Sequence, residues 1–310
     1  TNGIDIIIIK DISNIREREA GFIVILKKTA GLILELLISI FVIICVSALP
    51  TLFRGISFNF KEFLMTIKNV FLSLLHPQDI TYGWTVEKSL FPQIFLHYKE
   101  TILLIMTSIL ISTILSFLFT YLILLVFQKV KRKIMWFLTI IESLPDIFYI
   151  IVFQFLMIVI YKQTDRLLFN VASAGEDRAF FLPILCLSLP LILLLTKFLI
   201  QQFEREGEKL YVEYAVSKGM TPLYIFNVHI WKNVLFSLYH YSKTAIWFVI
   251  SNLIILEFMF NMTGIIYFVL RNSTPEIFVI GILMIYLPIF LFYRICEWLL
   301  PAIIRGEAID

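Results

Sequence analysis

The sequence predicts an all-α integral membrane protein with six transmembrane helices and with both termini in the cytoplasm. Of its 310 residues, 60% are hydrophobic, 16% are charged and 30 are Phe, which is more apolar than a soluble domain of this size. Apolar runs near the roughly 20 residues that cross a hydrocarbon core recur six times. The expected spans are residues 30–52, 101–127, 134–160, 180–200, 235–260 and 277–299.

Basic residues beside these runs predict the orientation. One cluster precedes the first span, and a second, Lys129–Lys133, lies between the second and third. The positive-inside rule puts both on the cytoplasmic side, in agreement with an even number of spans. We therefore expect a six-helix membrane domain, residues 30–299, between an N-terminal cytoplasmic segment, 1–29, and a C-terminal cytoplasmic tail, 300–310.

The external loop of residues 53–99 contains an expected amphipathic helix at about 59–75. Its apolar residues recur at spacings of three and four, opposite Lys61, Lys68 and Asn69. Two interpretations stay open: an interfacial helix with no role in transport, or a cover over the outer mouth of a pathway. The apolar set is Phe60, Phe63, Leu64, Ile67, Phe71 and Leu74.

The mostly polar segment of residues 208–233 separates two apolar runs and is predicted to form two short helices around a sharp corner. Gly219 ends the first helix, because glycine adopts the left-handed conformation at little cost. Thr221 followed by Pro222 is a helix-start signal, since the proline lacks only an N–H that would be unpaired anyway. Under the predicted orientation this corner is cytoplasmic.

Acidic residues within the apolar runs are the remaining candidates for function. Glu142 and Asp146 flank Pro145 in the third span, where each charge costs about 2.5 to 3.5 kcal/mol on insertion scales. Such groups face a cavity or protein rather than lipid. Glu142, Pro145 and Asp146 therefore either line a pathway and form a hinge, or pair with a neighbouring helix or a partner subunit. Glu257, near the outer end of the fifth span, has the same alternatives, with local burial and pairing as the safer one.

Motifs of enzymes are missing from the sequence. It contains no G-x-x-x-x-G-K-[ST] phosphate loop, no G-x-S-x-G and no H-E-x-x-H, and its four histidines are not spaced as a metal-ligand set. The net charge of +3 is too small to indicate nucleic-acid binding. We expect a non-catalytic protein that binds no metal or cofactor of its own and whose ATP hydrolysis, if any, takes place in another chain.

Residue types across the corner carry a family resemblance. Glu213-Tyr214-Ala215, three residues and Gly219 resemble the E-A-A-x-x-x-G loop of ABC-importer permeases, with Tyr214 as a departure. The longer pattern resembles the oligopeptide/dipeptide/nickel branch of that family. It comprises Tyr211, Val212, Ala215, Lys218 and Gly219, with His229, Lys232 and Asn233 beyond.

Segments on both sides of the corner extend the resemblance. Glu142–Pro145 is similar to the family's S-[IL]-P segment, and Glu257–Gly264 to its E-x-x-F-x-x-P-G segment, with Thr263 in place of proline. Prolines at 183 and 190 and the ending Leu300–Arg305 also resemble the family.

The resemblance implies a type I ABC-importer permease fold in a bacterial cytoplasmic membrane, and a cargo of peptides. It implies a second homologous permease, two ATPase subunits that bind ATP and Mg, and an extracellular substrate-binding protein as partners. Contact with the ATPases is implied for Tyr211, Glu213, Ala215, Lys218, Gly219, Thr221 and Pro222.

Two other functions stay open. A secondary active transporter also places carboxylates and broken helices near the middle of the membrane, although no convincing internal repeat relates residues 30–160 to 180–299. A non-transporting membrane regulator with a permease fold would keep the corner as well. ATP-dependent uptake distinguishes the importer from both.

Overall fold

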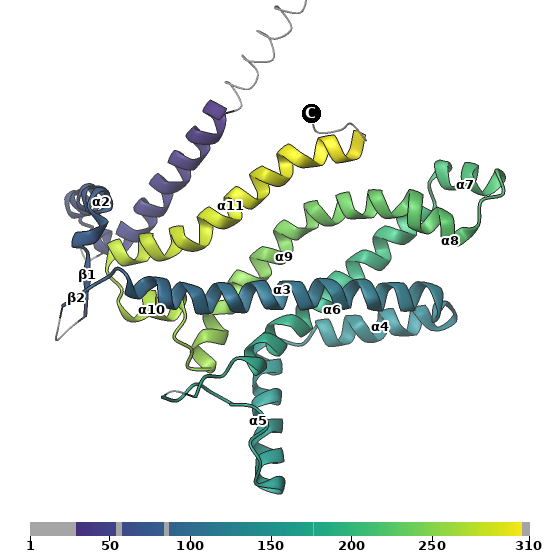
Figure 1. Cartoon of the computed structure of the whole chain (residues 1–310). Helices are drawn as coiled ribbons and strands as arrows, with labels where there is room; N and C mark the ends of the chain where they lie inside the picture. The colour runs from purple at the N-terminus through teal and green to yellow at the C-terminus, as the bar shows by residue number, and fades with distance from the viewer. Residues whose placement is uncertain (1–28, 54–57, 84–86, 176, 306–310) are drawn as a thin grey trace, which may run out of the picture. The chain divides into compact units, whose positions relative to one another are not determined.

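A computed structural model of the chain describes residues 29–53, 58–83, 87–175 and 177–305. Within them, six helices are long and apolar enough to cross a bilayer, so the chain is a multi-pass, all-α membrane protein. Of the expected terminal segments 1–29 and 300–310, residues 1–28 and 306–310 lie outside the described residues. The six helices are Thr29–Leu52, α3 (Gln93–Leu125), α5 (Asp146–Thr164), α6 (Phe181–Gly207), the run Pro222–Met259, and the Pro275–Leu299 part of α11 (Pro275–Arg305) (Figure 1).

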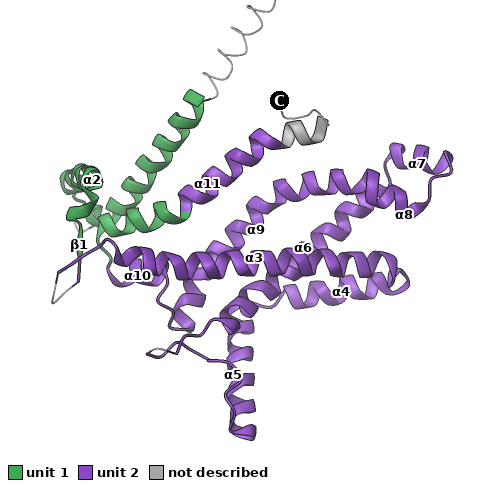
Figure 2. Ribbon diagram, in the orientation of Figure 1, with its two compact units in different colours: residues 1–81, 273–285 green, residues 82–272, 286–310 purple. Residues whose placement is uncertain are grey.

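The chain divides into two compact units, which Figure 2 distinguishes by colour. Unit 1 comprises residues 1–81 and 273–285. Its described part contains the helix Thr29–Leu52, α2 (Phe60–Leu75), η1 (Pro77–Asp79) and the first residues of α11. Ile44, Val70 and Val279 form its small buried core.

The predicted amphipathic helix at 59–75 is confirmed as α2, but its packed face differs from the expected one. Val70 is fully buried, whereas Phe60, Leu64 and Phe71 are each at least half exposed. Apolar side chains therefore surround more of α2 than the core of unit 1 covers. The remaining apolar face suits a lipid or a protein surface.

Unit 2 comprises residues 82–272 and 286–310 and is organised around α3 and α6. A row of small hydroxyl side chains on α3 is almost completely buried, and the Ser112 hydroxyl donates to the Ser188 carbonyl on α6 at 3.1 Å. Small residues allow two helix backbones to approach closely in a membrane protein. The row is Thr101, Ser108, Ser112, Ser116 and Thr120.

Shorter elements complete the fold. Their bounds are β1 (Thr81–Tyr82), β2 (Lys88–Ser89), η2 (Gln128–Val130), α4 (Lys131–Glu142), α7 (Leu210–Ser217), α8 (Pro222–Tyr224), η3 (Ile225–Ile230), α9 (Trp231–Met259) and α10 (Ile265–Arg271). The main core of unit 2 lies between α6 and α9 and includes Leu187, Leu191, Leu195, Val249 and Leu253.

The prediction of one continuous third span at 134–160 is wrong. α4 ends at Glu142, and α5 begins at Asp146 directly after Pro145. Proline disfavours the helical conformation of the residue before it and cannot donate a backbone hydrogen bond. The chain changes direction at the break (Figure 1). The Tyr149 hydroxyl donates to the Ile141 carbonyl at 2.5 Å and so satisfies an acceptor near the end of α4.

The second helix of the predicted corner is also not separate. α8, η3 and α9 follow one another without a gap, and the membrane-length run begins at Pro222 rather than at 235. No glycine or proline occurs between Pro222 and Met259, so nothing in this stretch ends the helix. Other spans are also longer than predicted: α3 begins at Gln93, α6 reaches Gly207 and α11 reaches Arg305.

Candidate functional site

The corner between α7 and α8 has the predicted backbone geometry (Figure 1). Gly219 has a φ of +79°, and its N–H donates to the Val216 carbonyl at 2.9 Å. The Thr221 hydroxyl oxygen accepts from the Tyr224 N–H at 3.4 Å, and Pro222 is the first residue of α8. A left-handed glycine and a threonine cap therefore produce the turn, as the sequence predicts.

Ala215 fastens the inner face of α7. Its side chain is buried in a cluster with Leu199 and Phe203 of α6, Ile225 and Ile230 of η3, and Val234 of α9. A larger side chain at this position would hold α7 away from α6. Of the residues predicted to contact an ATPase, Ala215 thus lies inside the protein.

A polar network around the buried Glu206 joins α7 to both neighbouring helices. The Glu206 carboxylate, at the end of α6, accepts from the Tyr211 hydroxyl at 2.9 Å, the Asn233 amide at 3.2 Å and the Lys209 ammonium at 2.5 Å. Asn233, on α9, also donates to the Tyr211 oxygen at 3.2 Å. Burial raises the pKa of Tyr211, and the Glu206 carboxylate raises it further, so the hydroxyl stays protonated and remains a donor.

The outer face of the corner is exposed and largely apolar. Glu213, Lys218, Gly219, Thr221 and Pro222 are all exposed there, as the prediction requires. The Lys218 ammonium lies 4.5 Å from the centre of the Tyr214 ring. Exposed apolar side chains around them are Leu210 (81%), Tyr214 (62%), Val216 (56%), Leu223 (54%) and Tyr224 (50%).

An apolar groove of about 480 Å³ continues this face. Val212 and Val216 of α7 line one part of it, and Leu223, Ile225 and Phe226 line another. The corner therefore combines a hollow with projecting side chains. Such a surface can hold an apolar side chain of another protein.

Glu206 was not predicted from the sequence as a residue of this site. Asn233 was named only as part of the family pattern. Glu206 lies in the last turn of α6 and 27 positions from Asn233. A carboxylate three residues before Lys209 signals at most a local ion pair. Its contact with α9 depends on the way the chain returns after Gly219.

The acids of the third span do not act as a pair. The Glu142 carboxylate accepts from the Lys197 ammonium of α6 at 2.6 Å, so pairing with a neighbouring helix is confirmed for Glu142. Asp146, in the first turn of α5 after Pro145, is partly covered and makes no ion pair with any described residue. Of the two acids, only Glu142 is therefore paired with a cation among the described residues.

Glu257 has a structural environment that contradicts a pathway-lining role in this conformation. It is fully buried. Its Oε1 accepts from the Thr101 hydroxyl at 2.5 Å, and its Oε2 accepts from the Tyr267 N–H at 2.8 Å. The Thr101 oxygen in turn accepts from the Ile265 N–H at 2.8 Å. Glu257 therefore ties the start of α10 to α9 and α3, which confirms local burial and pairing.

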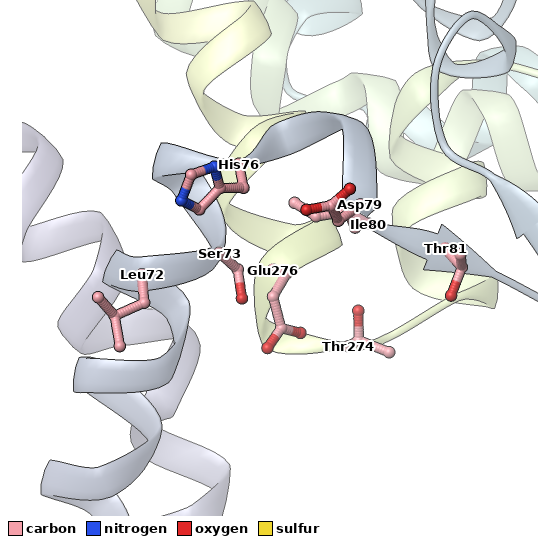
Figure 3. A pocket seen from close by; sticks show the side chains of 8 residues that line it. All are labelled: Leu72, Ser73, His76, Asp79, Ile80, Thr81, Thr274 and Glu276. Carbon is pink, nitrogen blue, oxygen red and sulfur yellow. The ribbon is translucent and has the colours of Figure 1, made fainter.

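Unit 1 contains a pocket of about 470 Å³ that several polar side chains line (Figure 3). Ser73 and His76 reach it from the end of α2, Asp79 from η1, and Thr274 and Glu276 from the start of α11. Among the described residues, no group of three His, Cys, Asp or Glu side chains, here or elsewhere, is placed to hold a metal ion.

Comparison with known proteins adds no relative. No protein-family model and no curated protein matches the sequence.

Proposed function

We propose that the chain is a transmembrane permease subunit of an ATP-driven importer of the oligopeptide/dipeptide/nickel type, with peptides as cargo. The observation that supports this most is the corner: an exposed apolar face, Leu210 to Tyr224, on a helix that is fastened to α6 and α9. Apolar clusters on the surface of a polar segment mark contacts with other proteins. This one has the motif expected of an ATPase-docking loop.

Movement of the corner has a direct route into the membrane. Glu206 is the end of α6, Asn233 is the first turn of α9, and Tyr211 on α7 bonds to both. Force applied to α7 is therefore passed to two spans at once. ATP and Mg would bind to the partner ATPases, and their closure would favour the outward-open state of the permease. A population shift requires that the closed ATPases bind one state more tightly than the other.

The chain would also form half of a translocation pathway, near the break between α4 and α5. The break at Ser143–Pro145 gives a hinge between α4 and α5, and Asp146 supplies a polar group there. A second homologous permease would complete the pathway, and an extracellular binding protein would deliver the peptide. Both termini and the corner would lie in the cytoplasm of a bacterial cell, with the chain in its cytoplasmic membrane.

The first test is co-purification. The chain is isolated from its own membranes in mild detergent, and the accompanying proteins are identified by mass spectrometry. A second permease and ATPases should accompany the wild type, and Leu210→Asp should deplete the ATPases, because Leu210 is 81% exposed on the proposed docking face. Leu167→Asp is the control, since Leu167 is also exposed but lies after α5. A wild type that emerges alone, where other ABC assemblies survive, contradicts the proposal.

One observation favours a secondary active transporter as the second candidate. Asp146 is a carboxylate without a cationic partner among the described residues, at a break between two helices, which is an arrangement that such transporters use to bind coupling ions. Uptake of a labelled peptide into vesicles separates the two functions. It should need ATP in the importer and an ion gradient in the secondary transporter, and a non-transporting regulator would show neither.

A further inference from the structure

The turn between α3 and α4 carries basic side chains that the proposed function does not use. Lys129, Lys131, Arg132 and Lys133 occur within five positions. Lys131 pairs with Glu204 of α6. Lys129, Arg132 and Lys133 are exposed, and none of the three forms an ion pair with any other described residue. Three positive charges thus project from one end of unit 2.

The outer face of α4 changes from basic to aromatic within one turn. Arg132 and Lys133 are followed by Trp136 and Phe137, which are three and four positions further and so lie on the same face. Trp136 is 69% exposed and Phe137 57%. One helical turn advances about 5.4 Å, so the charges and the rings lie about one turn apart along this face.

The opposite face of α4 is occupied by the protein. Lys131, Ile134, Met135 and Leu138 are all partly covered, whereas the basic and aromatic residues between them are exposed. α4 therefore has one face that packs in unit 2 and one that nothing in the described structure covers. The second face carries cations at its N-terminal end and aromatic rings one turn further on, and both residue types are typical of a membrane–water interface.

The backbone adds a further preference for anions. α4 is 12 residues long, and its N-cap residue, Val130, makes no side-chain hydrogen bond to the first turn. The Lys131 N–H donates to the Gln128 carbonyl of η2, and the positive end of the α4 dipole lies among the three basic residues, where it favours a negative charge.

We infer that Lys129, Arg132, Lys133 and Trp136 form a binding site for the headgroup of an anionic phospholipid. Cationic side chains would bind the phosphate, and Trp136 and Phe137 would lie along the glycerol and upper chain region. Clusters of four or more basic residues beside a transmembrane helix bind anionic lipids in this way. The site neither requires nor excludes the importer function.

Lipid retention by the purified full chain tests the site. The chain in mild detergent receives equal amounts of dioleoylphosphatidylglycerol and dioleoylphosphatidylcholine, and native mass spectrometry counts the lipid bound. The wild type should retain the glycerol lipid preferentially. Replacement of Lys129, Arg132 and Lys133 by Gln should weaken its binding about hundredfold, since each basic residue near a membrane surface contributes about fivefold. Binding of the choline lipid should change little.

Two further variants keep the test specific. Lys88, Lys99 and Lys162 are also exposed, and their joint replacement by Gln removes the same charge from β2, α3 and α5. This control should bind lipid as the wild type does. Trp136→Ala should weaken both lipids and keep the preference for the glycerol lipid, because the charges remain.

Several results overturn the inference. The basic triplet is not a lipid site if the wild type shows no preference, or if both triple variants lose it equally. Millimolar inorganic phosphate that displaces the lipid identifies a free-phosphate site instead. If the basic-triplet variant retains lipid but loses a protein that co-purifies with the wild type and with the control, the triplet is a protein-docking surface.

Discussion

The Tyr211 hydroxyl on α7 lies 2.9 Å from the Glu206 carboxylate at the end of α6, and the Asn233 amide of α9 contacts both. Three helices thus meet through one buried carboxylate. The contact fastens the corner to the membrane helices, because Tyr211 of α7 is hydrogen-bonded both to Glu206 of α6 and to Asn233 of α9.

Tyr211→Phe should loosen this junction. It removes a hydrogen bond to a charged group, which contributes about 1.5 to 3 kcal/mol, and we expect a loss of about 1.5 kcal/mol, near the lower limit, because Tyr211 is half-buried. Thermal unfolding in detergent measures the loss, and amide hydrogen exchange should locate it in α7. Tyr214→Phe is the matched control, since the Tyr214 hydroxyl is exposed and unbonded among the described residues. Equal effects of the two changes would contradict the role of Glu206.

Local signals in the sequence were sufficient for the corner. Gly219, Thr221 and Pro222 each act through their own backbone conformation or through a neighbour at most three positions away. The number of spans, six, followed from apolar length alone, although the bounds of the third and fifth did not. Both properties belong to short stretches of chain, so a reader of the sequence can recover them.

Contacts between distant residues could not be predicted. Glu257 and Thr101 are 156 positions apart, and an acid in an apolar run gives no sign of which helix satisfies it. The hydroxyl row on α3 was missed because its importance depends on α6 lying against it. The break at Ser143–Pro145 was not predicted within the expected span of residues 134–160, since a proline can either kink or end a helix and the neighbouring contacts decide between the two.

Gly219→Ala should destabilise the corner through the backbone alone. A Cβ at Gly219 would meet nothing within 4 Å, but the φ of +79° is unfavourable for a residue with a side chain. We expect a loss of about 1 to 2 kcal/mol. The measurement is thermal unfolding together with recovery of the ATPases in co-purification.

Gly207→Ala is the matched control for Gly219. Its Cβ would also meet nothing within 4 Å, and Gly207 lies at the end of α6 without a positive φ. Alanine favours a helix over glycine by about 0.8 to 1 kcal/mol, so this change should be neutral or stabilising. If Gly207→Ala and Gly219→Ala lower stability equally, the positive φ of Gly219 is not the cause of its loss.

Lys197→Gln should destabilise the contact between α4 and α6. It leaves Glu142 without its partner at 2.6 Å. Breaking a buried pair costs about 3 to 5 kcal/mol, but these side chains are 26% and 35% exposed, so we expect about 2 kcal/mol. Thermal unfolding is again the measurement, and exchange of the charges in Glu142→Lys with Lys197→Glu should recover at least half of the loss.

Lys243→Gln tests whether any lysine would have this effect. Its ammonium lies 3.7 Å from the Glu297 carboxylate, and the two side chains are 50% and 37% exposed. An exposed pair contributes about 0.2 to 1 kcal/mol. A loss as large as that of Lys197→Gln would show that lysine removal, rather than the pairing with Glu142, is responsible.

Gly264→Ala should lower the stability of unit 2 strongly, although it adds a single methyl group. Gly264 has an ordinary backbone conformation, with φ of −73°, but a Cβ there would overlap the Glu257 carboxylate, which is fully buried. The carboxylate cannot move without losing its bonds to Thr101 and Tyr267. Overpacking costs about 1 to 3 kcal/mol and each lost buried hydrogen bond about 1 to 3 kcal/mol, so we expect at least about 3 kcal/mol in thermal or denaturant unfolding.

Gly31→Ala, with nothing within 4 Å of its Cβ, is the control and should change stability little. Glu257→Ala is damaging by itself, but Gly264→Ala added to it should cost much less than in the wild type, because the clashing carboxylate is gone. Additive losses in the double variant would mean that Gly264 and Glu257 do not constrain each other.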